Sequence, residues 1–328
     1  MIPKVSIIIL NWNGLEDTIE CLESLKKISY PNYEVILVDN GSKGNDADIL
    51  VDKYKNYIKL IRNKENLGFA KGNNIAIWQV LKEGKSDYIL CLNNDITVEP
   101  NFLNELVKSA ERYPEAGSIQ PKMIWALHPK LIDSAGLEYS KTGFGFDRGK
   151  YESIEKYNKE EEILGGCAGA CLYKTEALED IRINGYYFNK DFFATYEDFD
   201  LALRLQWAGW KSWYCPRAVI YHFRGNTIGV KSKFTAYYRT RNQTLNLFKN
   251  LSAKFILKNL HFIVLAQIAQ IGINILKGRF SLLPSIIKGR IDGYLALRKI
   301  FQKRKKIKKR VNFYELEKWF PLKWRVKI

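Results

Sequence analysis

Short apolar runs alternate with helical patterns through the first hundred residues of the chain. The apolar runs are rich in β-branched residues and have the length of strands buried on both faces; they cover residues 5–10, 34–39, 58–62 and 88–92. The segments between them repeat apolar residues at helical spacing, over residues 15–27, 46–54 and 70–82. This alternation predicts an α/β fold with a parallel sheet, and such sheets bind ligands beyond the carboxyl ends of their strands.

Polar, turn-forming residues stand at the ends of three of these runs. They are Asn-Trp-Asn-Gly at 11–14, Asp-Asn-Gly-Ser at 39–42 and Asn-Asn-Asp at 93–95, and the segment 63–74 adds further asparagines and glycines. Because these ends meet at one edge of a parallel sheet, we expect a binding site there. The turn after the first run lacks GxGxxG, and no GxxxxGK[ST] occurs, which argues against a dehydrogenase and a P-loop nucleotidase.

Asp95 is the candidate metal ligand at that edge. A carboxylate in a strand-end turn, preceded by two amides, suits a hard divalent cation that shares its coordination with a diphosphate; a turn cap is the other interpretation. His222 ends a further apolar run, at 219–222. It belongs to the same site only if the fold brings it to Asp95, and is otherwise a hydrogen-bonded core histidine.

Residues 115–230 change character, and their glycines, aromatics and isolated turns predict a mixed sheet with irregular loops. The charged segment 152–162 is expected to be an exposed loop. Glu197, Asp198 and Asp200 stand directly before an amphipathic helical pattern, where backbone N–H groups stabilise negative charge. One acid suffices as a helix cap, so three suggest that one of them acts as a general base on a substrate hydroxyl.

Six segments, in order along the chain, together resemble a known family. They are VSIIILNWNG (5–14), VDNGS (38–42), NKENLGFAKGNN (63–74), LNNDITVEP (92–100), GACLYKTEAL (169–178) and FFATYEDFDLALRLQWAGW (192–210). They resemble family-2 glycosyltransferases of the nucleotide-sugar-dependent, inverting kind, and most of all the rhamnosyltransferase-like branch. The resemblance implies a GT-A-type Rossmann-like nucleotide-sugar-binding domain with a mixed sheet over residues 1–230. Its nucleotide-binding half is expected at about 1–100 and its acceptor-binding half at about 101–230.

The resemblance also assigns roles in donor and metal binding. The residues implied in nucleotide-sugar binding are Asn11, Asn13, Asp39, Asn66, Gly68, Asn73, Asn94 and Asp95. Asp95 matches the last acid of the family's DXD-like element, but Asn93 and Asn94 stand where earlier acids are usual and should weaken metal binding. His222 matches the position that completes the site of a divalent metal, Mg²⁺ or Mn²⁺. Metal ligands are therefore expected at Asp95 and His222.

The catalytic base is assigned in the same way. Asp198 matches it, and Glu197 is the alternative because adjacent acids cannot be told apart from sequence. In the implied reaction the base removes a proton from an acceptor hydroxyl, which attacks and inverts the anomeric carbon. The metal neutralises charge on the departing nucleoside diphosphate. Arg239 and Arg241 follow the catalytic half as candidate phosphate ligands, although a solvated surface explains them equally well.

Positive charge is concentrated at the C-terminal end. The formal net charge is +17, and residues 231–328 carry 24 Lys and Arg against three Asp and Glu, whereas residues 1–230 carry 28 against 32. Such a segment seeks an anionic partner, either nucleic acid or an anionic membrane surface. No recognised nucleic-acid module surrounds it, so no nucleic acid is expected.

The hydrophobic pattern of residues 231–328 favours the membrane. The segment 255–276 is apolar except for one polar helical stripe, formed by Gln267, Gln270 and Asn274, and is short for a membrane span. A second amphipathic pattern covers 282–301, and a polybasic run at 303–310 precedes Trp319 and Trp324. We expect C-terminal basic amphipathic helices, in a region 231–328, that bind an anionic membrane surface. The alternative is that these helices pack on the catalytic domain.

These features predict transfer of a sugar from a dTDP- or UDP-sugar to a hydroxyl of a glycan or polyprenol-linked acceptor in cell-envelope glycan assembly. Rhamnose is the sugar that the branch resemblance implies. A nucleic-acid-binding protein and a non-catalytic scaffold are the alternatives, the second raised by Asn93 and Asn94. The N-terminus lacks a signal-peptide layout, and five cysteines form no disulfide framework. The protein is expected in the cytoplasm, peripheral on the inner face of the membrane.

Overall fold

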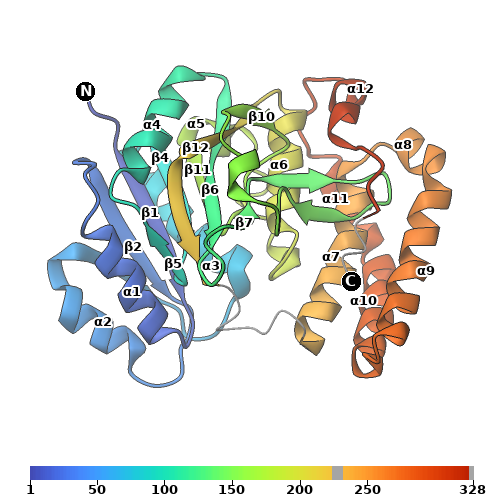
Figure 1. Cartoon of the computed structure of the whole chain (residues 1–328), viewed down its shortest axis with the longest axis horizontal. Helices are drawn as coiled ribbons and strands as arrows, with labels where there is room; N and C mark the ends of the chain where they lie inside the picture. The colour runs from blue at the N-terminus through green and yellow to red at the C-terminus, as the bar shows by residue number, and fades with distance from the viewer. Residues whose placement is uncertain (224–231, 325–328) are drawn as a thin grey trace.

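A central ten-stranded mixed sheet organises the chain, and helices cover both of its faces (Figure 1). The computed structural model describes residues 1–223 and 232–324. The strands follow the order β10-β12-β6-β11-β4-β1-β2-β3, with β5 paired to β12 and β7 to β6. The α/β class and the GT-A-type mixed sheet predicted from the sequence are confirmed.

Residues 5–93 contain four parallel strands with helices between them. The strands are β1 (Val5–Asn11), β2 (Tyr33–Asp39), β3 (Ile58–Arg62) and β4 (Tyr88–Asn93). The helices are α1 (Leu15–Leu25), α2 (Asp46–Tyr54), the short η1 (Lys55–Tyr57) and α3 (Gly68–Glu83). Successive β1 side chains point to opposite faces, so Ile7 and Ile9 pack in the core beneath α1 while Ile8 packs in the core beneath α3.

The second half extends the sheet with antiparallel neighbours. β11 runs antiparallel to β4 and β6, β12 runs parallel to β6 and antiparallel to β5, and β8 with β9 forms a separate hairpin. The strands are β5 (Ile96–Val98), β6 (Ala116–Trp125), β7 (Ile132–Ser134), β8 (Leu137–Tyr139), β9 (Gly145–Asp147), β10 (Glu161–Ile163), β11 (Ala170–Lys174) and β12 (Lys211–His222). The helices are α4 (Phe102–Arg112), η2 (Ile154–Lys156), α5 (Thr175–Asp180), η3 (Lys190–Phe192) and α6 (Glu197–Trp207).

The segment 152–162 differs from its prediction as an exposed loop. It contains η2, and its last two residues open β10, which pairs with β12 at the edge of the sheet. Glu161 and Glu162 hid this strand, because consecutive acids break the apolar alternation that marks a strand. Charged side chains on an edge strand also discourage pairing with another chain.

The C-terminal helices pack against α6 and neighbouring elements of residues 1–223. They are α7 (Lys233–Asn250), α8 (Ala253–Lys258), α9 (Leu260–Leu276), η4 (Phe280–Leu282), α10 (Leu283–Leu295), α11 (Leu297–Arg304), α12 (Phe313–Leu316) and η5 (Glu317–Trp319), and α7–α11 stand together on the right of Figure 1. One hydrophobic core joins Phe199 and Trp207 of α6 to Leu245 of α7, Phe255 of α8 and Phe313 of α12. Within the described residues, no helix combines the length and hydrophobicity needed to cross a bilayer. The division into regions at residue 230 stays a prediction.

Candidate active site

The carboxyl ends of β1, β2 and β4 lie side by side and bring their polar residues together. Asn11 stands opposite Asp39 in the register of β1 and β2, and Leu10 stands opposite Asn93 in that of β1 and β4. Asn11 is fully buried, and its amide donates to Asp39 Oδ1 at 3.0 Å while its carbonyl accepts from the Thr18 hydroxyl at 2.9 Å. Asn11 therefore ties the two strand ends together from beneath the site.

Asp39 and Asn13 shape the turn beside Asn11. The Ser42 hydroxyl donates to Asp39 Oδ1 at 2.6 Å and accepts from the Asn13 backbone N–H at 2.9 Å. Asn13 is exposed, has a φ of 52°, and its side-chain oxygen accepts from the Lys43 N–H at 2.6 Å. Asparagine tolerates this left-handed conformation better than most residues. The two residues border the same open strand end.

Asn66 and Gly68 reach the site through Asn40, which the sequence analysis did not single out. The buried Asn40 donates to Asn66 Oδ1 at 3.0 Å and accepts from Asn63 at the same distance, so it fixes the loop after β3. Gly68 has a φ of 76°, and a Cβ there would lie 2.6 Å from the Phe193 side chain. Only glycine fits at the start of α3. The VDNGS motif contained the signal for Asn40.

Asn73 and Asn94 are held by neighbouring backbone. Asn73 donates to Phe69 O at 3.0 Å within α3. Asn94 donates to Gly14 O at 3.3 Å, and a Cβ on Gly14 would lie only 2.5 Å from its amide nitrogen. Both asparagines are almost fully buried. Asn94 thus locks the turn before Asp95 onto the turn after β1.

His222 lies between two carboxylates at the end of β12. It stands opposite Ile96 of β5, which brings its Nε2 to 3.1 Å from Asp95 Oδ1. Its Nδ1 lies 2.8 Å from Asp133 Oδ2, on β7. Burial favours the neutral imidazole, but the hydrogen bonds to both carboxylates raise the pKa of His222 to about 9. The fold thus brings His222 to Asp95, and the metal-binding role of the two residues stays a prediction.

Asp95 and His222 fit a shared metal site by their chemistry. A carboxylate oxygen and an imidazole nitrogen suit Mn²⁺, and metals that assist diphosphate departure keep few protein ligands because the substrate phosphates supply the rest. Across residues 1–223 and 232–324, no group of three or more His, Cys, Asp or Glu residues forms a self-sufficient metal cage. Asp133, absent from the sequence prediction, holds the other ring nitrogen of His222 as outer carboxylates do at metal-binding histidines.

Asp198 and Glu197 open α6 in a strained turn. Phe193, Thr195 and Tyr196 have φ values of 58°, 66° and 66°, and such non-glycine residues cluster at functional sites. Burial, and then repulsion from Asp147, raises the pKa of Asp198 to about 7. Burial and the neighbouring Asp198 raise the pKa of Glu197 well above its usual value.

The turn between β10 and β11 contacts Asp198 on one side and the end of β4 on the other. The Ala168 backbone N–H stabilises the Asp198 carboxylate, and the next residue, Gly169, accepts from the Asn93 N–H at 2.7 Å. Asn93 ends β4, two residues before Asp95. The turn at 168–169 thus connects Asp198 to the end of β4, and a shared site for the two pairs of residues stays a prediction.

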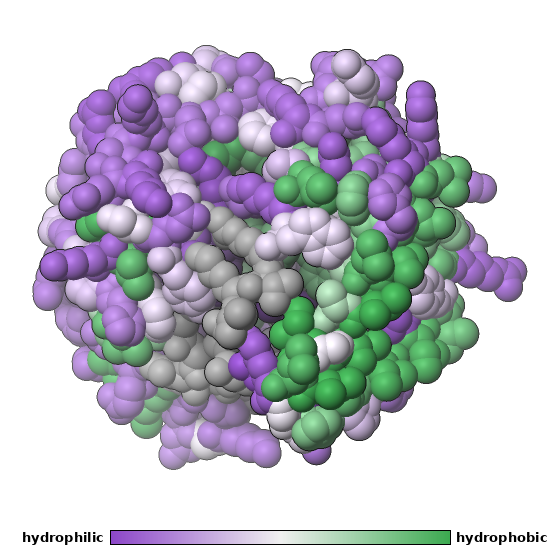
Figure 2. All heavy atoms as spheres, turned by 45° about the vertical axis from the view of Figure 1, so that its right-hand side comes forward, coloured by the Kyte–Doolittle hydropathy of each residue, from purple (hydrophilic) through white to green (hydrophobic). Residues whose placement is uncertain are grey.

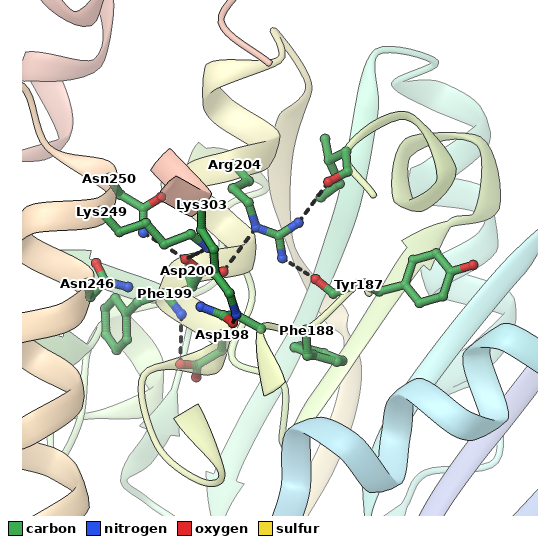
Figure 3. A network of polar contacts seen from close by, with 12 residues as sticks. Tyr187, Phe188, Asp198, Phe199, Asp200, Arg204, Asn246, Lys249, Asn250 and Lys303 are labelled. Atoms are coloured by element: carbon green, nitrogen blue, oxygen red, sulfur yellow. Dashed lines mark hydrogen bonds and ion pairs between the residues drawn. The ribbon is translucent and has the colours of Figure 1, made fainter. Parts of the chain in front are cut away.

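Asp200, the third acid, has a structural role (Figure 3). It is fully buried, and Lys249 Nζ lies 2.5 Å from its Oδ1 while Arg204 Nε lies 3.0 Å from its Oδ2. Asn250 donates to the same Oδ1 at 2.9 Å. Burial alone would raise the pKa of Asp200, but the two cations lower it to about 2. Asp200 is thus ionised and fixes α6 against α7.

The parallel strand ends, the mixed extension and the Asp95–His222 pair are typical of nucleotide-sugar-dependent transferases of the GT-A class. The chain belongs to glycosyl transferase family 2, whose family model matches residues 6–182, so it is a glycosyltransferase. A Mycobacterium tuberculosis protein described as N-acetylglucosaminyl-diphospho-decaprenol L-rhamnosyltransferase is 26% identical over 225 residues, which cover 63% of this chain and 72% of that protein.

Further relatives and solved structures agree. Poly-beta-1,6-N-acetyl-D-glucosamine synthase of Staphylococcus epidermidis is 23% identical to this chain. The aligned residues cover 70% of this chain and 52% of the synthase. GalNAc-T7, solved with UDP, GalNAc and Mn²⁺, superposes with a TM-score of 0.62 at 13% identity, over 77% of this chain and 49% of that one. PcManGT of Pyrobaculum calidifontis, solved with GDP-Man and Mn²⁺, gives 0.55 at 15% identity, over 94% and 85%. These likenesses show the fold.

Proposed function

We propose that the chain is an inverting glycosyltransferase that uses Asp198 as its general base. The observation that carries this proposal is the pKa of Asp198, raised to about 7 at the strand edge that also holds Asp95 and His222. A base with a pKa near neutrality is largely ionised at working pH and still takes a proton readily. Glu197 is held protonated by its burial and by the charge beside it, which favours Asp198 over the alternative.

The donor is a nucleoside-diphosphate sugar bound at the ends of β1, β2 and β4. Residues around that edge, from Asn13 and Asp39 to Asn66 and Gly68, surround the nucleotide, while Asn11, Asn73 and Asn94 hold the turns in place. Rhamnose on dTDP is the leading donor because the M. tuberculosis relative is described as an L-rhamnosyltransferase. A UDP-sugar is the competitor, since S. aureus TarS has been solved with UDP-GlcNAc and superposes with a TM-score of 0.56.

Asp95 and His222 would hold a divalent metal together with the donor phosphates. When bound, the metal would supply neutralisation of the charge that builds on the departing nucleoside diphosphate. Asp133 accepts from His222 Nδ1 and so keeps Nε2 directed toward Asp95. The two asparagines before Asp95 leave the protein with little negative charge of its own there, so metal and donor are expected to bind together.

The acceptor is a polyprenol-linked glycan at the cytoplasmic face of the membrane. The relative's description names a diphospho-decaprenol acceptor, and a lipid-linked substrate requires the enzyme at a membrane surface. Asp198 removes the proton from an acceptor hydroxyl, whose oxygen attacks the anomeric carbon from the face opposite the diphosphate. The carbon–phosphate oxygen bond breaks, the configuration inverts, and the proton remains on Asp198 until solvent takes it.

A donor screen tests this function. The melting temperature is measured with dTDP-rhamnose, UDP-GlcNAc and UDP-glucose, each with and without Mn²⁺, and donor turnover is then followed with the best ligand. We expect one nucleotide sugar to stabilise the protein only with metal, and Asp198→Asn to retain this binding while losing turnover. The matched control is Asp48→Asn, which makes the same change at an exposed carboxylate on α2. No stabilisation by any pair, or unchanged turnover in Asp198→Asn, would favour a non-catalytic scaffold.

A further inference from the structure

Helix α9 has its polar stripe turned inward. The Tyr294 hydroxyl donates to Gln267 Oε1 at 3.4 Å, and Gln270 donates to Thr240 Oγ1 at 3.4 Å while its oxygen accepts from Arg290 at 3.0 Å. These contacts place the polar side of α9 against α7 and α10. A surface helix of a water-soluble protein is normally arranged the other way, with its apolar stripe inside.

The outward side of α9 is apolar along its whole length. No Asp, Glu, Lys or Arg occurs between residues 260 and 276. The large apolar side chains left exposed there are Leu260, Val264, Leu265, Ile268, Ile271, Ile275 and Leu276. They recur every three or four positions and so form one continuous helical face.

Neighbouring elements extend this surface. Exposed apolar side chains continue onto η4, α10 and α11, at Phe280, Ile287, Ile291, Leu295 and Phe301. Phe280 and Ile287 line a shallow, open hollow together with Leu283, Pro284, Lys288, Ile291 and Asp292. Figure 2 shows the resulting green area on the side of the molecule that carries the C-terminal helices. We call these residues and the exposed side of α9 the apolar face; contiguous apolar surface of this kind marks a binding surface.

Basic residues belong to the same helices as the apolar face. Lys254 and Lys258 precede it on α8, Lys277 and Arg279 follow α9, and Lys288 lies on α10. Between residues 251 and 314 the sequence has one acid, Asp292, which already accepts from Lys288 at 2.7 Å and from the Tyr237 hydroxyl at 2.6 Å. An apolar centre with cationic surroundings is complementary to a bilayer that contains anionic lipids.

The polybasic run at 303–310, which the sequence analysis assigned to the membrane, is engaged elsewhere. Lys303 pairs with Asp191 at 2.6 Å, and Lys308 and Arg310 pair with Asp180 at 2.8 and 2.6 Å. Arg304 donates to the Phe248 and Leu251 carbonyls, and Lys306 donates to Asn184 at 2.7 Å. The run therefore binds the chain's own catalytic half and fastens α11 to it.

We propose that the apolar face inserts into the interfacial layer of an anionic lipid bilayer and holds the enzyme there without spanning it. The apolar face is thus the surface by which the enzyme reaches the membrane. The inference rests on the proposed function, because the lipid-linked acceptor is the reason for a membrane location. A second copy of the chain is a poorer occupant, because docking two such faces would bring like charges from both copies together. The bilayer accommodates both the exposed leucines and isoleucines and the surrounding lysines.

Vesicle sedimentation tests the apolar face. Full-length protein, without donor, is mixed with vesicles of equal parts phosphatidylcholine and phosphatidylglycerol. We expect Ile268→Glu/Ile291→Glu to lower the partition coefficient by about tenfold or more, because two side chains can no longer enter the apolar layer. The control Ile49→Glu/Trp78→Glu changes exposed apolar residues on α2 and α3 and should bind as wild type does. Unchanged melting temperatures establish that both variants are folded.

Four further measurements decide the remaining alternatives. Neutralising two residues of the polybasic run with Lys308→Gln/Arg310→Gln should leave vesicle binding within about twofold, and high salt should weaken but not abolish vesicle binding. If Ile268→Glu/Ile291→Glu binds vesicles as the wild type does, the inference is overturned. It is also overturned if sedimentation velocity shows that the wild type is a dimer and the variant a monomer. Donor turnover, measured without vesicles, should be the same in both variants. If binding behaves as expected while no donor is turned over, the proposed function fails and the membrane face stands.

Discussion

Three carboxylates within four residues have three different fates at the start of α6. Asp200, between Lys249 and Arg204, has a pKa of about 2 and is ionised throughout the physiological range. Asp198, buried and near Asp147, has a pKa of about 7, and that of Glu197 is raised well above its usual value. Their surroundings give the three carboxyl groups different pKa values, so that one is a structural anion, one a candidate base and one a protonated acid. The sequence alone could not show this difference, because the three residues are adjacent or nearly so.

The two remaining acids can be separated by amide substitution. Asp198→Asn should lower kcat by about 10²–10⁴, the usual contribution of a general base, because its amide cannot take the acceptor proton. Glu197→Gln should lower kcat by less than about tenfold, because the native group is already protonated and the amide has nearly its shape. Steady-state kinetics with saturating donor and metal measure both. The reverse order of losses would make Glu197 the base.

Asp133 can be tested through metal affinity. Asp133→Asn weakens the partner of His222 Nδ1 and should reduce Mn²⁺ affinity in the presence of nucleotide by about 10–100-fold, as loss of an outer carboxylate generally does. Electron paramagnetic resonance of free Mn²⁺ measures this without turnover. Glu99→Gln is the control, because Glu99 bonds the neighbouring Tyr221 hydroxyl and should leave the affinity unchanged. Equal affinities in wild type and Asp133→Asn would remove Asp133 from the site.

The sequence named Asp95 and His222 because they end or follow apolar runs, and Asp198 because it stands before a helical pattern. Their roles in catalysis and metal binding stay predictions. Asn40 and Asp133 were missed because their importance lies in partners that only the fold supplies. Asp133 sits on a three-residue strand, too short to show a hydrophobic period.

Helix α7 links the C-terminal region to the acids at the start of α6. Lys249 at the end of α7 carries the charge that keeps Asp200 ionised, and burial lowers the pKa of Lys249 to about 8. Arg241 of α7, a candidate phosphate ligand from the sequence, instead donates to the Asp191 carbonyl and to Asn242. The long strands β1–β4 were predictable from continuous apolar runs, whereas the direction of the polar stripe on α9 could be known only from its neighbours.

Removing the Lys249 charge should destabilise the protein strongly. Lys249→Met leaves Asp200 without its closest cation in a buried position, and breaking a buried pair in this way costs about 3–5 kcal/mol. Urea unfolding at neutral pH measures the loss, and Lys249→Met/Asp200→Asn should recover part of it. In the wild type the contribution of Asp200 is complete above its unfolded pKa near 4 and is lost as pH falls toward 2. A loss below about 1 kcal/mol would contradict this account.

The close approach of α10 to α7 depends on glycine. A Cβ on Gly289 would lie 2.5 Å from the Tyr237 carbonyl oxygen, so Gly289→Ala should separate the helices and cost about 1–3 kcal/mol. Gly272→Ala, on α9, meets open space and should be neutral or stabilising by up to about 1 kcal/mol. Thermal and urea unfolding compare the two. Equal effects would mean that α10 is not held as described.

In the whole molecule, part of the positive charge at the C-terminal end of the sequence is paired with acids of residues 1–223. The polybasic run pairs with Asp180 and Asp191, whereas Lys288 beside the apolar face pairs with Asp292. The fold class and the family could be predicted because the N-terminal strands and motifs are continuous in sequence. The packing of the polybasic run could not be predicted, because Lys308 and Asp180 are far apart in the sequence and come together only in the folded chain.

The pH dependence of kcat/KM for sugar transfer tests whether Asp198 is the general base. With the donor identified by the screen, kcat/KM should rise with pH and level off above an apparent pKa of about 7, because Asp198 must be ionised to accept the proton. In Asp198→Asn the residual rate should be low and show no such rise. A wild-type profile that stays flat between about pH 5 and 8, or a titration that persists in Asp198→Asn, would contradict the account.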